Sequence, residues 1–547
     1  MAVPSAKAGI VACCAFVFLL VCGCTEKKLS NVEYGNQNQI IYCGNGDEPK
    51  SLDPHLTTGS PDNNIIINLF EGLISKDHAT LEPQPGVAKS WTISEDGRVY
   101  RFQLREEARW SNGDPLTAED FVYSWRRALT PSVPNAYAYM MYNIEGAEDF
   151  HAGKITDFAQ VGVKALSAHE LEVRLTHPAH YFLQLLDHHS YYPIHGPTLE
   201  KFGGINDPAS RWTLPGNLVG NGPFVLKNWE INKVIELAKS ETYWDKDAVK
   251  LRGAHFFPID DQQGEERAFR TGQIHLTNTP QMDIEKIETY RKKNPDVLRV
   301  VPTYASYYYE FNVNRKPFDD ARVRRAFALA VDRKLIVEKV TKGGEVPAQN
   351  FVPPDPAGYQ PQVYWQEDIE EARRLLAEAG YPDGKNFPVY SLMYNTHDNH
   401  QKVALAVQQM LKKNLNIDIQ LENKEWKVYM MARKNLEHDI VRAGWVADYM
   451  DPSNFFDILR SYSGNNNTGW KNERYDELMK QIAAASDTAH RNELFEEANR
   501  LLAEEMPVLP LYYYSDLNLV HTSVQGWYDN AMHYHPLKHV YLQQPEP

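Results

Sequence analysis

The sequence predicts a chain of several domains in which α-helices and β-strands intermix. Two observations support this class, which is α/β or α+β. Helix and strand patterns follow each other throughout the chain, and the roughly 520 residues after the apolar leader are enough for two or three domains. The sequence contains no repeat, low-complexity tract or long linker. Short breaks containing Pro and Gly mark the predicted boundaries, at 193–197, 215–223 and 353–361.

The first residues have the pattern of an export signal. Lys7 precedes an apolar run, Ile10 to Val21, which is too short to span a bilayer and has the length of a signal-peptide core. The run ends in Leu20-Val-Cys-Gly-Cys24, which resembles a lipobox. We therefore expect a signal peptide over 1–23 and a mature chain tethered by acyl chains on Cys24. The alternative is an ordinary signal peptide cut nearby.

The cysteine content and the net charge limit which disulfide bonds and which partners are expected. The leader removes three of the five cysteines and Cys24 carries the lipid, so Cys43 remains alone and no intramolecular disulfide is expected. The net charge is −15, and loss of Lys7 with the leader makes it one unit more negative. Phosphate backbones require a basic face, so nucleic acid is not expected as a partner. The acidity mainly favours solubility.

Local signals place the elements along the chain. A run rich in aromatic and β-branched residues predicts a strand at 99–104, and Thr117 with Asp120 three residues later opens a helix that ends before Pro131. Further strands are predicted at 171–175, 234–237 and 307–313. The segment 369–379 is predicted as a helix that stops at Gly380. Apolar spacing predicts three more helices, at 403–411, 475–485 and 491–505.

Motifs of known catalytic centres are incomplete. His169-Glu170 begins a zinc-protease helix motif, but Val173 stands where the second histidine is required. Gly44-Asn-Gly46 lacks the third glycine of a dinucleotide-binding turn. The sequence contains neither a G-x-S-x-G nucleophile elbow nor a Walker A lysine motif. We therefore expect no catalytic residues and no cofactor.

Histidines come close together at three places in the sequence. The pairs are His188 with His189, His397 with His400, and His533 with His535. His397 and His400 have a spacing that could share a metal ion. Because the chain has 19 histidines, such pairs are expected by chance, and we expect no metal site.

One segment, Arg442-Ala-Gly-Trp-Val-Ala-Asp-Tyr-Met-Asp-Pro452, combines residues that suit a zwitterionic peptide. Arg442 and Asp448 carry opposite charges, which match the two ends of such a ligand. Gly444 allows a ligand backbone to approach closely, because it has no Cβ. Trp445 offers a flat apolar wall with one donor. The alternative is a surface ion pair beside a tryptophan of the core.

Several further motifs identify a family. They are Ser51-Leu-Asp-Pro-His55, Leu69-Phe-Glu-Gly72, Pro85-Gly-Val-Ala88, Trp110-Ser-Asn-Gly-Asp-Pro-Leu-Thr-Ala-Glu-Asp-Phe-Val-Tyr-Ser-Trp125, Tyr307-Tyr-Tyr-Glu-Phe-Asn312, Glu378-Ala-Gly-Tyr381 and Tyr394-Asn-Thr396. With the Arg442 segment, they resemble the extracytoplasmic oligopeptide-binding proteins of ABC importers, the family 5 solute-binding proteins. The resemblance runs in order from about Leu52 to about Tyr514.

This resemblance implies an α/β, periplasmic-binding-protein-like fold, bilobal and hinged, with an additional third lobe. Lobe I is expected to be discontinuous and to comprise 24–70, 197–304 and 515–547. Lobe II, the extra lobe, is expected at 71–196, and lobe III, the second ligand-binding lobe, at 305–514. Lobes I and III would close around a ligand like a hinged trap.

The resemblance also implies the binding residues. Asp448 would pair with the α-ammonium group, Gly444 and Val446 would form a β-like ladder with the peptide, and Thr58 and Ser60 would do so on its other side. The residues expected at side-chain pockets are Trp426, Trp445 and Tyr308. Those expected near the peptide carboxylate are Arg433, Arg442 and His400, and Tyr137 is the expected contact from lobe II. The alternative for the aromatic residues is that they belong to the core, and for Arg433 that it lies on a solvated helix face.

Three positions depart from the best-known relatives. Thr58 replaces an acidic residue, Thr279 replaces an asparagine, and Val446 replaces a cysteine. Loss of the acidic residue is expected to reduce the preference for basic side chains at the N-terminal end of the ligand.

The expected function is that of a monomeric, lipid-anchored, extracytoplasmic receptor that captures short peptides and delivers them to the membrane-spanning subunits of an ABC permease. One alternative keeps the scaffold and changes the cargo to a murein peptide, to haem or to a metal complex held by His397 and His400. A further alternative is a secreted hydrolase.

Overall fold

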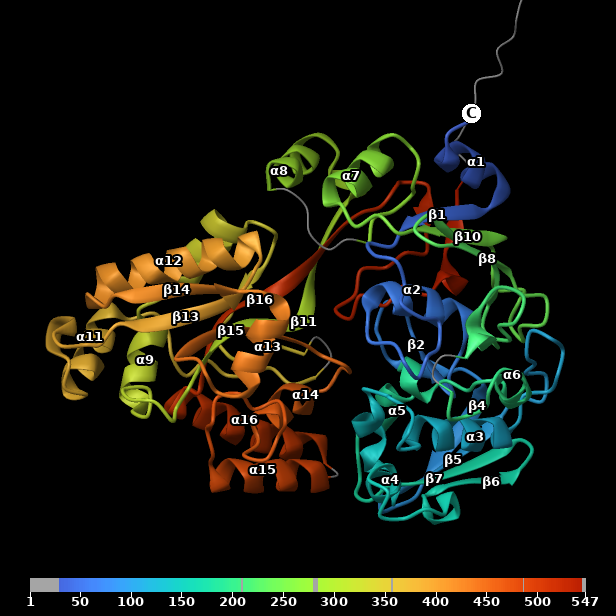
Figure 1. Ribbon diagram of the computed structural model, residues 1–547, viewed down its shortest axis with the longest axis horizontal. Helices are drawn as coiled ribbons and strands as arrows, with labels where there is room; N and C mark the ends of the chain where they lie inside the picture. Colours follow the sequence, from blue (N-terminus) through green and yellow to red (C-terminus); the bar gives the residue numbers. More distant parts are fainter. Residues whose placement is uncertain (1–28, 208–209, 279–283, 356–357, 486, 544–547) are drawn as a thin grey trace, which may run out of the picture.

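The structure is a computed structural model that describes residues 29–207, 210–278, 284–355, 358–485 and 487–543. The predicted signal peptide, the predicted lipidation site Cys24 and Thr279 lie outside these ranges. Within them, no helix is both long and apolar enough to cross a membrane. We keep the predicted residue ranges as the definitions of lobes I, II and III. Figure 1 shows lobe III on the left, with lobe I above lobe II on the right.

A four-stranded sheet of order β1-β10-β9-β8 forms the centre of lobe I. Its strands are β1 (Ile40–Gly44), β8 (Phe224–Glu230), β9 (Val234–Lys239) and β10 (Gly253–Phe257). β1 pairs with β10 in parallel, with Ile40 beside Gly253, so distant parts of the chain share one sheet. The surrounding helices are α1 (Asn31–Asn38), α2 (Ser60–Leu69), α6 (Gly196–Lys201), α7 (Gln262–Arg270) and α8 (Ile284–Lys293). The hairpin β17 (Val524–Gln525) and β18 (Tyr541–Leu542) contributes to the same hydrophobic core.

Lobe II contains an antiparallel sheet of order β4-β5-β7-β6. Its strands are β4 (Ala88–Ile93), β5 (Val99–Leu104), β6 (Val163–Ser167) and β7 (Glu170–Arg174), and a hairpin adds β2 (Ile74–Lys76) and β3 (Pro83–Pro85). Its helices are α3 (Ala118–Leu129), α4 (Ala147–His151) and α5 (Phe182–Leu185). The predicted capping box is present at the start of α3, where the Asp120 carboxylate accepts a hydrogen bond from the Thr117 amide. The buried face of α3, including Phe121 and Trp125, closes the core of this lobe.

Lobe III contains a six-stranded sheet of order β12-β16-β11-β15-β13-β14. Its strands are β11 (Leu298–Phe311), β12 (Val346–Pro347), β13 (Tyr390–Asn395), β14 (Ile419–Lys424), β15 (Ile440–Val446) and β16 (Val508–Leu519). Its helices are α9 (Ala321–Leu329), α10 (Arg333–Leu335), α11 (Ile369–Glu378), α12 (Asp398–Leu415), α13 (Trp426–Lys434), α14 (Ser453–Phe456), α15 (Glu473–Ala484) and α16 (Thr488–Glu505).

The two faces of this sheet bury different sets of side chains. Tyr307 and Tyr309 pack in one hydrophobic cluster with residues of α9, α11 and α12. Tyr308 packs in another cluster with residues of α14, α15 and α16. This follows from strand geometry, because successive side chains of β11 point to opposite faces. The helices on both sides therefore hold the central strands of lobe III in place.

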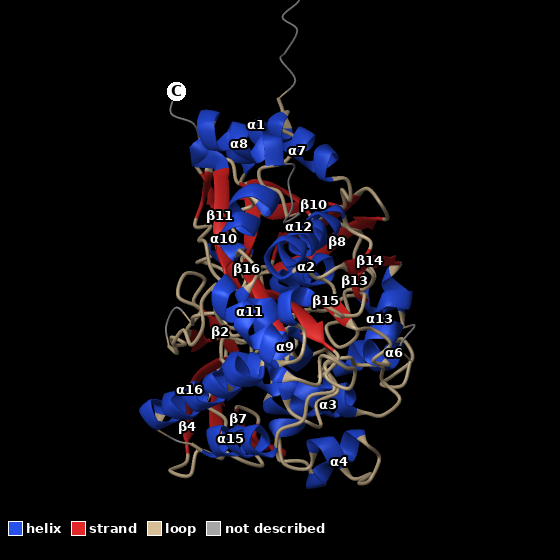
Figure 2. Ribbon diagram, turned by 90° about the vertical axis from the view of Figure 1, so that its left-hand side faces the viewer, coloured by secondary structure: helices blue, strands red, loops and turns tan. Residues whose placement is uncertain are grey.

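Two long strands, β11 and β16, connect lobes I and III. The predicted lobe boundaries at 304/305 and 514/515 fall inside them. Their outer halves pack against α7 and α8, where Leu298 and Leu519 share a cluster with Phe269 and Tyr290. Figure 2 shows β11 and β16 running from the side of α7 and α8 into lobe III. Their register shifts between Pro302 and Ser306, which places an irregular pairing where a hinge is expected.

The elements predicted from the sequence compare as follows with the structure. The strand at 99–104 coincides with β5, and the helix at 369–379 is α11, followed by Gly380 with a φ of +98°. The helices at 403–411, 475–485 and 491–505 lie within or close to α12, α15 and α16. The predicted start of the strand at Tyr307 is wrong, because β11 begins at Leu298. Pro302, which pairs with Ser515 next to the register shift, interrupts the sequence pattern without ending the strand.

Candidate functional site

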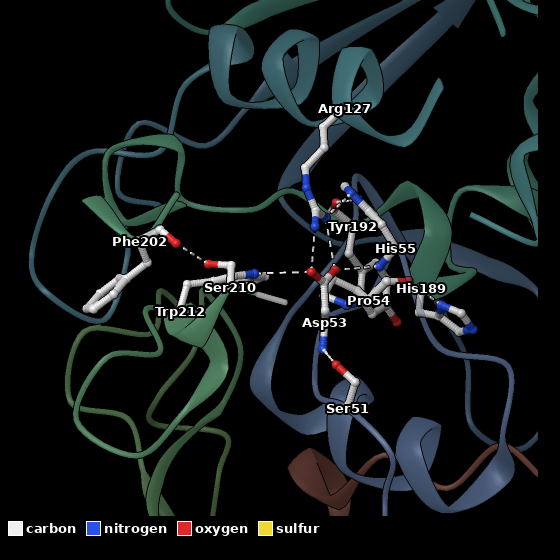
Figure 3. Close-up of polar contacts among 10 residues, drawn as sticks. All are labelled: Ser51, Asp53, Pro54, His55, Arg127, His189, Tyr192, Phe202, Ser210 and Trp212. Atoms are coloured by element: carbon white, nitrogen blue, oxygen red, sulfur yellow. Dashed lines mark hydrogen bonds and ion pairs between the residues drawn. The ribbon is translucent and has the colours of Figure 1, made fainter. Parts of the chain in front are cut away.

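The Ser51–His55 motif forms a buried polar network between lobes I and II (Figure 3). The Asp53 carboxylate accepts two hydrogen bonds from Arg127, from Nη1 at 2.9 Å and from Nη2 at 2.6 Å. It also accepts one from Nε1 of Trp212 at 3.1 Å. Burial alone would raise the pKa of Asp53, but the Arg127 guanidinium outweighs it and the pKa lies below its ordinary value. The pair is therefore ionised and joins α3 of lobe II to lobe I.

His55 and His189 complete this network. Nε2 of His55 lies 3.1 Å from the Tyr192 carbonyl oxygen, and Nδ1 of His189 lies 2.6 Å from the Pro54 carbonyl oxygen. Burial and the nearby Arg127 charge lower the pKa of His55 to about 3, and burial lowers that of His189 to about 4. Both rings are therefore neutral and serve to fix the backbone of the motif.

The loop that follows the motif carries the predicted contacts Thr58 and Ser60. Both residues are exposed, and Ser60 is the first residue of α2. The Asp62 carboxylate holds the preceding chain by accepting hydrogen bonds from the Lys50 amide at 2.6 Å and the Ser51 amide at 3.0 Å. The loop is thus anchored on both sides while its polar groups remain accessible.

Across the hinge, strand β15 has one open edge. Its pairing with β11 extends from Ile440 to Val446, whereas its pairing with β13 is recorded only at Ile440 and Val441. The Ala447 amide donates to the Tyr304 carbonyl, so Ala447 faces β11. Because backbone groups alternate in direction along a strand, those of Gly444 and Val446 face the open edge. Val446 has 67% of its surface exposed. The backbone groups of these two residues are therefore not hydrogen-bonded to β11 or β13 in the described structure.

Gly444 also makes room for a side-chain contact. A Cβ at this position would lie 2.6 Å from the Tyr514 hydroxyl and 3.2 Å from Nη2 of Arg442. Arg442 donates a hydrogen bond from Nη2 to that hydroxyl at 2.5 Å. From the sequence, we expected Gly444 to allow the close approach of a ligand backbone. The structure shows a second requirement, the contact between Arg442 and Tyr514.

Arg442 is a half-buried cation surrounded by neutral groups. Its guanidinium lies 4.8 Å from the centre of the Tyr307 ring, and Nη1 lies 3.4 Å from Oδ1 of Asn395. Among the described residues, no carboxylate forms an ion pair with it, and its buried Nε has no hydrogen-bond partner. Such an uncompensated charge favours an incoming carboxylate.

His400 lies beside this cation on α12. Its Nδ1 is 3.4 Å from the Tyr307 hydroxyl, and its ring centre is 4.6 Å from that of His397. Burial, followed by the Arg442 charge, lowers the pKa of His400 to about 2. His400 is therefore neutral and can offer a ring nitrogen as a polar contact. In the part of the chain that the structure describes, no group of three or more His, Cys, Asp or Glu residues could hold a metal ion.

Asp448 follows the end of β15 and is largely desolvated. Its Oδ2 accepts a hydrogen bond from the Tyr139 hydroxyl at 3.1 Å and a longer one from Nδ2 of Asn454 at 3.5 Å. Burial raises the pKa of Asp448 above its ordinary value, although both hydrogen bonds act against this shift. No cationic side chain among the described residues pairs with it. A carboxylate in this state favours an incoming cation.

The structure gives the surroundings of three other predicted residues. Arg433 on α13 forms two hydrogen bonds of 2.7 Å with the buried Glu310 carboxylate, so its charge is already compensated and it does not lie on a solvated helix face. Tyr308 is fully buried, which supports its alternative assignment to the core. Trp445 is half-buried and donates from Nε1 to Oδ1 of Asn454 at 2.7 Å.

Tyr137 and Trp426 complete the predicted set. Tyr137, in lobe II, is half-buried with its ring edge-on to His188 and His189. Burial and then the Asp448 charge raise the pKa of Tyr137 to about 12. The side chain of Trp426 lies outside the described part of the structure.

Sequence reasoning missed three polar residues at this site. They are Tyr139, Asn454 and Tyr514, which contact Asp448, Trp445 and Arg442. Tyr139 lies two residues after Tyr137, and Asn454 follows the turn at Pro452, so proximity to predicted residues was a usable signal. Tyr514 ends a run of three tyrosines that has no distinguishing sequence feature.

These features define a hinged ligand-binding protein. An open strand edge lies between an uncompensated guanidinium and an uncompensated carboxylate, on a lobe joined to the rest of the molecule by two strands. Residues 82–467 match the family described as bacterial extracellular solute-binding proteins, family 5 Middle. The chain belongs to this family.

Curated relatives and solved structures are similar over nearly the whole chain. The periplasmic oligopeptide-binding protein OppA of Escherichia coli K12 is 40% identical over 501 residues, 90% of each chain. The murein peptide-binding protein MppA of the same organism is 35% identical over 529 residues, 94% of this chain and 95% of the relative. The unliganded open form of MppA superposes with a TM-score of 0.79 at 34% identity, over 92% of this chain and 98% of that one. Haemophilus influenzae OppA in complex with RPPGFSPFR gives 0.76 at 34% identity, over 92% and 99%.

Proposed function

We propose that this protein captures short peptides outside the cytoplasmic membrane and delivers them to the permease of an ABC importer. The observation that carries the proposal is the pair Arg442 and Asp448, two oppositely charged groups without ionic partners among the described residues, on either side of an open β-edge. The relatives named for oligopeptides and murein peptides support the same class of ligand.

The direction of the ligand follows from these charges. Asp448 lies beyond the C-terminal end of β15 and would bind the α-ammonium, whereas Arg442 lies within the strand and would bind the carboxylate. The peptide would thus run antiparallel to β15 and pair with Gly444 and Val446. Six extended residues span at most about 20 Å, and the Arg and Asp side chains shorten this gap, so about three or four ligand residues fit.

Common peptide features therefore supply the recognition. The main chain and both termini are present in every short peptide, so a receptor that binds them accepts many sequences. The compensated pair Arg433–Glu310 makes Arg433 a less favourable receptor for the ligand carboxylate. Arg442, with His400 beside it, is the better supported receptor of the carboxylate.

The test uses protein freed of co-purified ligand by reversible unfolding. Isothermal titration calorimetry compares one tripeptide with its N-acetylated and C-amidated forms, and native mass spectrometry identifies ligand that remains bound after purification. We expect binding of the free tripeptide and loss of affinity when either terminus is blocked. Equal affinity for all three forms would refute the assignment of both termini.

The same preparation separates the alternatives. Peptides recovered intact after incubation support a carrier, whereas cleavage products in the mass spectrum would support a hydrolase. A metal complex or haem as cargo would make binding sensitive to a chelator or give a visible absorption band.

The lipid tether and the permease are further parts of this proposal. The lipobox-like segment before Cys24 supports acylation outside the cytoplasm. In cells, a Cys24→Ala variant is expected to lose incorporation of labelled palmitate and to leave the membrane fraction. Incorporation that persists in this variant would refute acylation at Cys24. Crosslinking of the loaded receptor to the permease subunits tests delivery.

A further inference from the structure

Tyr139 connects lobe II directly to the anchor carboxylate. It lies in a 3₁₀ segment, Ala138–Asn143, and its hydroxyl donates to Oδ2 of Asp448 across 309 positions of sequence. The second hydrogen bond to the carboxylate, from Asn454, reaches the same oxygen. Among the described residues, no hydrogen bond reaches Oδ1. One oxygen is thus held and the other is available.

Neighbouring contacts show that residues of lobe II also pack against the chain next to Asp448. The Tyr449 ring stacks on Tyr181 at 4.7 Å with an interplanar angle of 17°, and Tyr449 is buried within the hydrophobic cluster of lobe II. Nε2 of His180 lies 2.5 Å from the Ala485 carbonyl oxygen of lobe III. In this structure lobe II therefore packs against the anchor loop of lobe III.

A chain of ring contacts continues from Tyr139 towards lobe I. The Tyr139 ring lies 6.3 Å from that of Tyr137, which lies 5.4 Å from the ring of His189. His189 contacts the Pro54 carbonyl, in the motif that precedes Thr58 and Ser60. Lobe II thus contacts both sequence segments that carry the predicted peptide contacts.

We propose that Tyr139 is a positioning residue for the N-terminus of the ligand. Its hydroxyl holds Oδ2 of Asp448 so that Oδ1 faces the α-ammonium group, and the docking of lobe II onto the Asp448 loop is thereby coupled to recognition of a free amine. This inference rests on the proposed function, which assigns the ammonium to Asp448 without assigning a role to lobe II in orienting it.

The chemistry of this contact indicates that Tyr139 assists the binding of an ammonium group by Asp448 and does not compete with it. A hydroxyl that donates to a carboxylate stabilises its charged form, which is the form that binds an ammonium group. Burial and the Asp448 charge raise the pKa of Tyr139, so its hydroxyl remains protonated and able to donate. Within the described ranges, the titratable side chains whose pKa values respond to the Asp448 charge include Tyr139 and Tyr137, and both are neutral at physiological pH.

The decisive variant is Tyr139→Phe, which removes the hydroxyl and keeps the ring. We expect about a tenfold loss of affinity for the free tripeptide, because one hydrogen bond to a charged group is lost. We also expect the acid limb of the affinity profile to move to higher pH, because Asp448 loses a donor that favours its charged form. Affinity for the N-acetylated peptide should not change.

Tyr142→Phe is the matched control, since Tyr142 lies in the same 3₁₀ segment and is half-buried against His151. It should leave both the affinity and the pH profile as in the parent protein. Unchanged or tighter binding by Tyr139→Phe, or an unmoved acid limb, would overturn the role of Tyr139. If instead the parent protein shows no preference for a free amine, the proposed function itself fails, and the two outcomes are thereby distinguished.

Discussion

Replacing Asp448 with asparagine tests the anchor on which the proposed function depends. The amide has nearly the same shape and still accepts a hydrogen bond from the Tyr139 hydroxyl, so the change removes charge and little else. Truncating one partner of a buried, hydrogen-bonded charge pair costs about 2–5 kcal/mol. Because part of the Asp448 surface is exposed, we expect a cost at the lower end of this range, about 2–3 kcal/mol. This cost corresponds to a loss of affinity of about 30- to 150-fold.

The assay is calorimetry with the free and the N-acetylated tripeptide. The parent protein should bind the acetylated form about as weakly as Asp448→Asn binds the free form, since each removes one partner of the same charge pair. The melting temperature without ligand should not fall, because the variant removes a desolvated charge. An affinity within twofold of the parent would refute the ammonium assignment.

The pH dependence provides an independent check on the same carboxylate. Burial raises the pKa of Asp448, and only the ionised form attracts an ammonium group. Affinity should therefore be highest at pH values above this raised pKa and should decrease as the pH drops through it. The decrease should begin above the ordinary aspartate pKa of about 3.9. Asp448→Asn should show no such acid limb, and an identical limb in both proteins would assign it to another group.

Three further variants test the neighbouring features. Arg442→Gln should weaken a free-acid tripeptide about tenfold or more and leave its C-amidated form unchanged in calorimetry, whereas equal losses would exclude Arg442 as the receptor of the carboxylate. Gly444→Ala places a Cβ 2.6 Å from the Tyr514 hydroxyl and should destabilise the protein by about 1–3 kcal/mol in thermal unfolding. Adding Tyr514→Phe should recover part of this loss, and strict additivity would contradict the predicted clash. Asp53→Asn leaves the buried Arg127 poorly compensated and should cost about 3–5 kcal/mol in chemical denaturation, more than the double variant Asp53→Leu with Arg127→Leu.

Helix ends could be predicted from the sequence where a particular residue type favours a particular backbone conformation. The Thr117–Asp120 capping box and the positive φ of Gly380 both appear where the sequence predicts them. β11 was only partly predictable, because Pro302 breaks the pattern while the neighbouring strand β16 keeps the segment extended. Interactions outside the local sequence therefore decided where that strand begins.

For the candidate site, the resemblance supplied residues whose roles stay predictions, whereas contacts between distant segments could not be inferred from the sequence. Asp448, Gly444, Val446 and Arg442 occupy positions that suit the expected contacts. The Glu310 partner of Arg433 lies 123 positions away, so no local pattern reveals it. Tyr139 approaches Asp448 from another lobe, so its place two residues after the predicted Tyr137 was the only local signal.

The open edge of β15 has a consequence for the behaviour of the protein in concentrated solution. Unpaired strand edges are templates on which chains polymerise, and proteins commonly shield them with charges or covering segments. Here α13 shields one side, where the Tyr429 hydroxyl donates to the Arg442 carbonyl, and Tyr139 of lobe II closes the far end. These two contacts narrow the stretch of β15 on which a second folded molecule could pair. We therefore expect them to disfavour self-association through this edge.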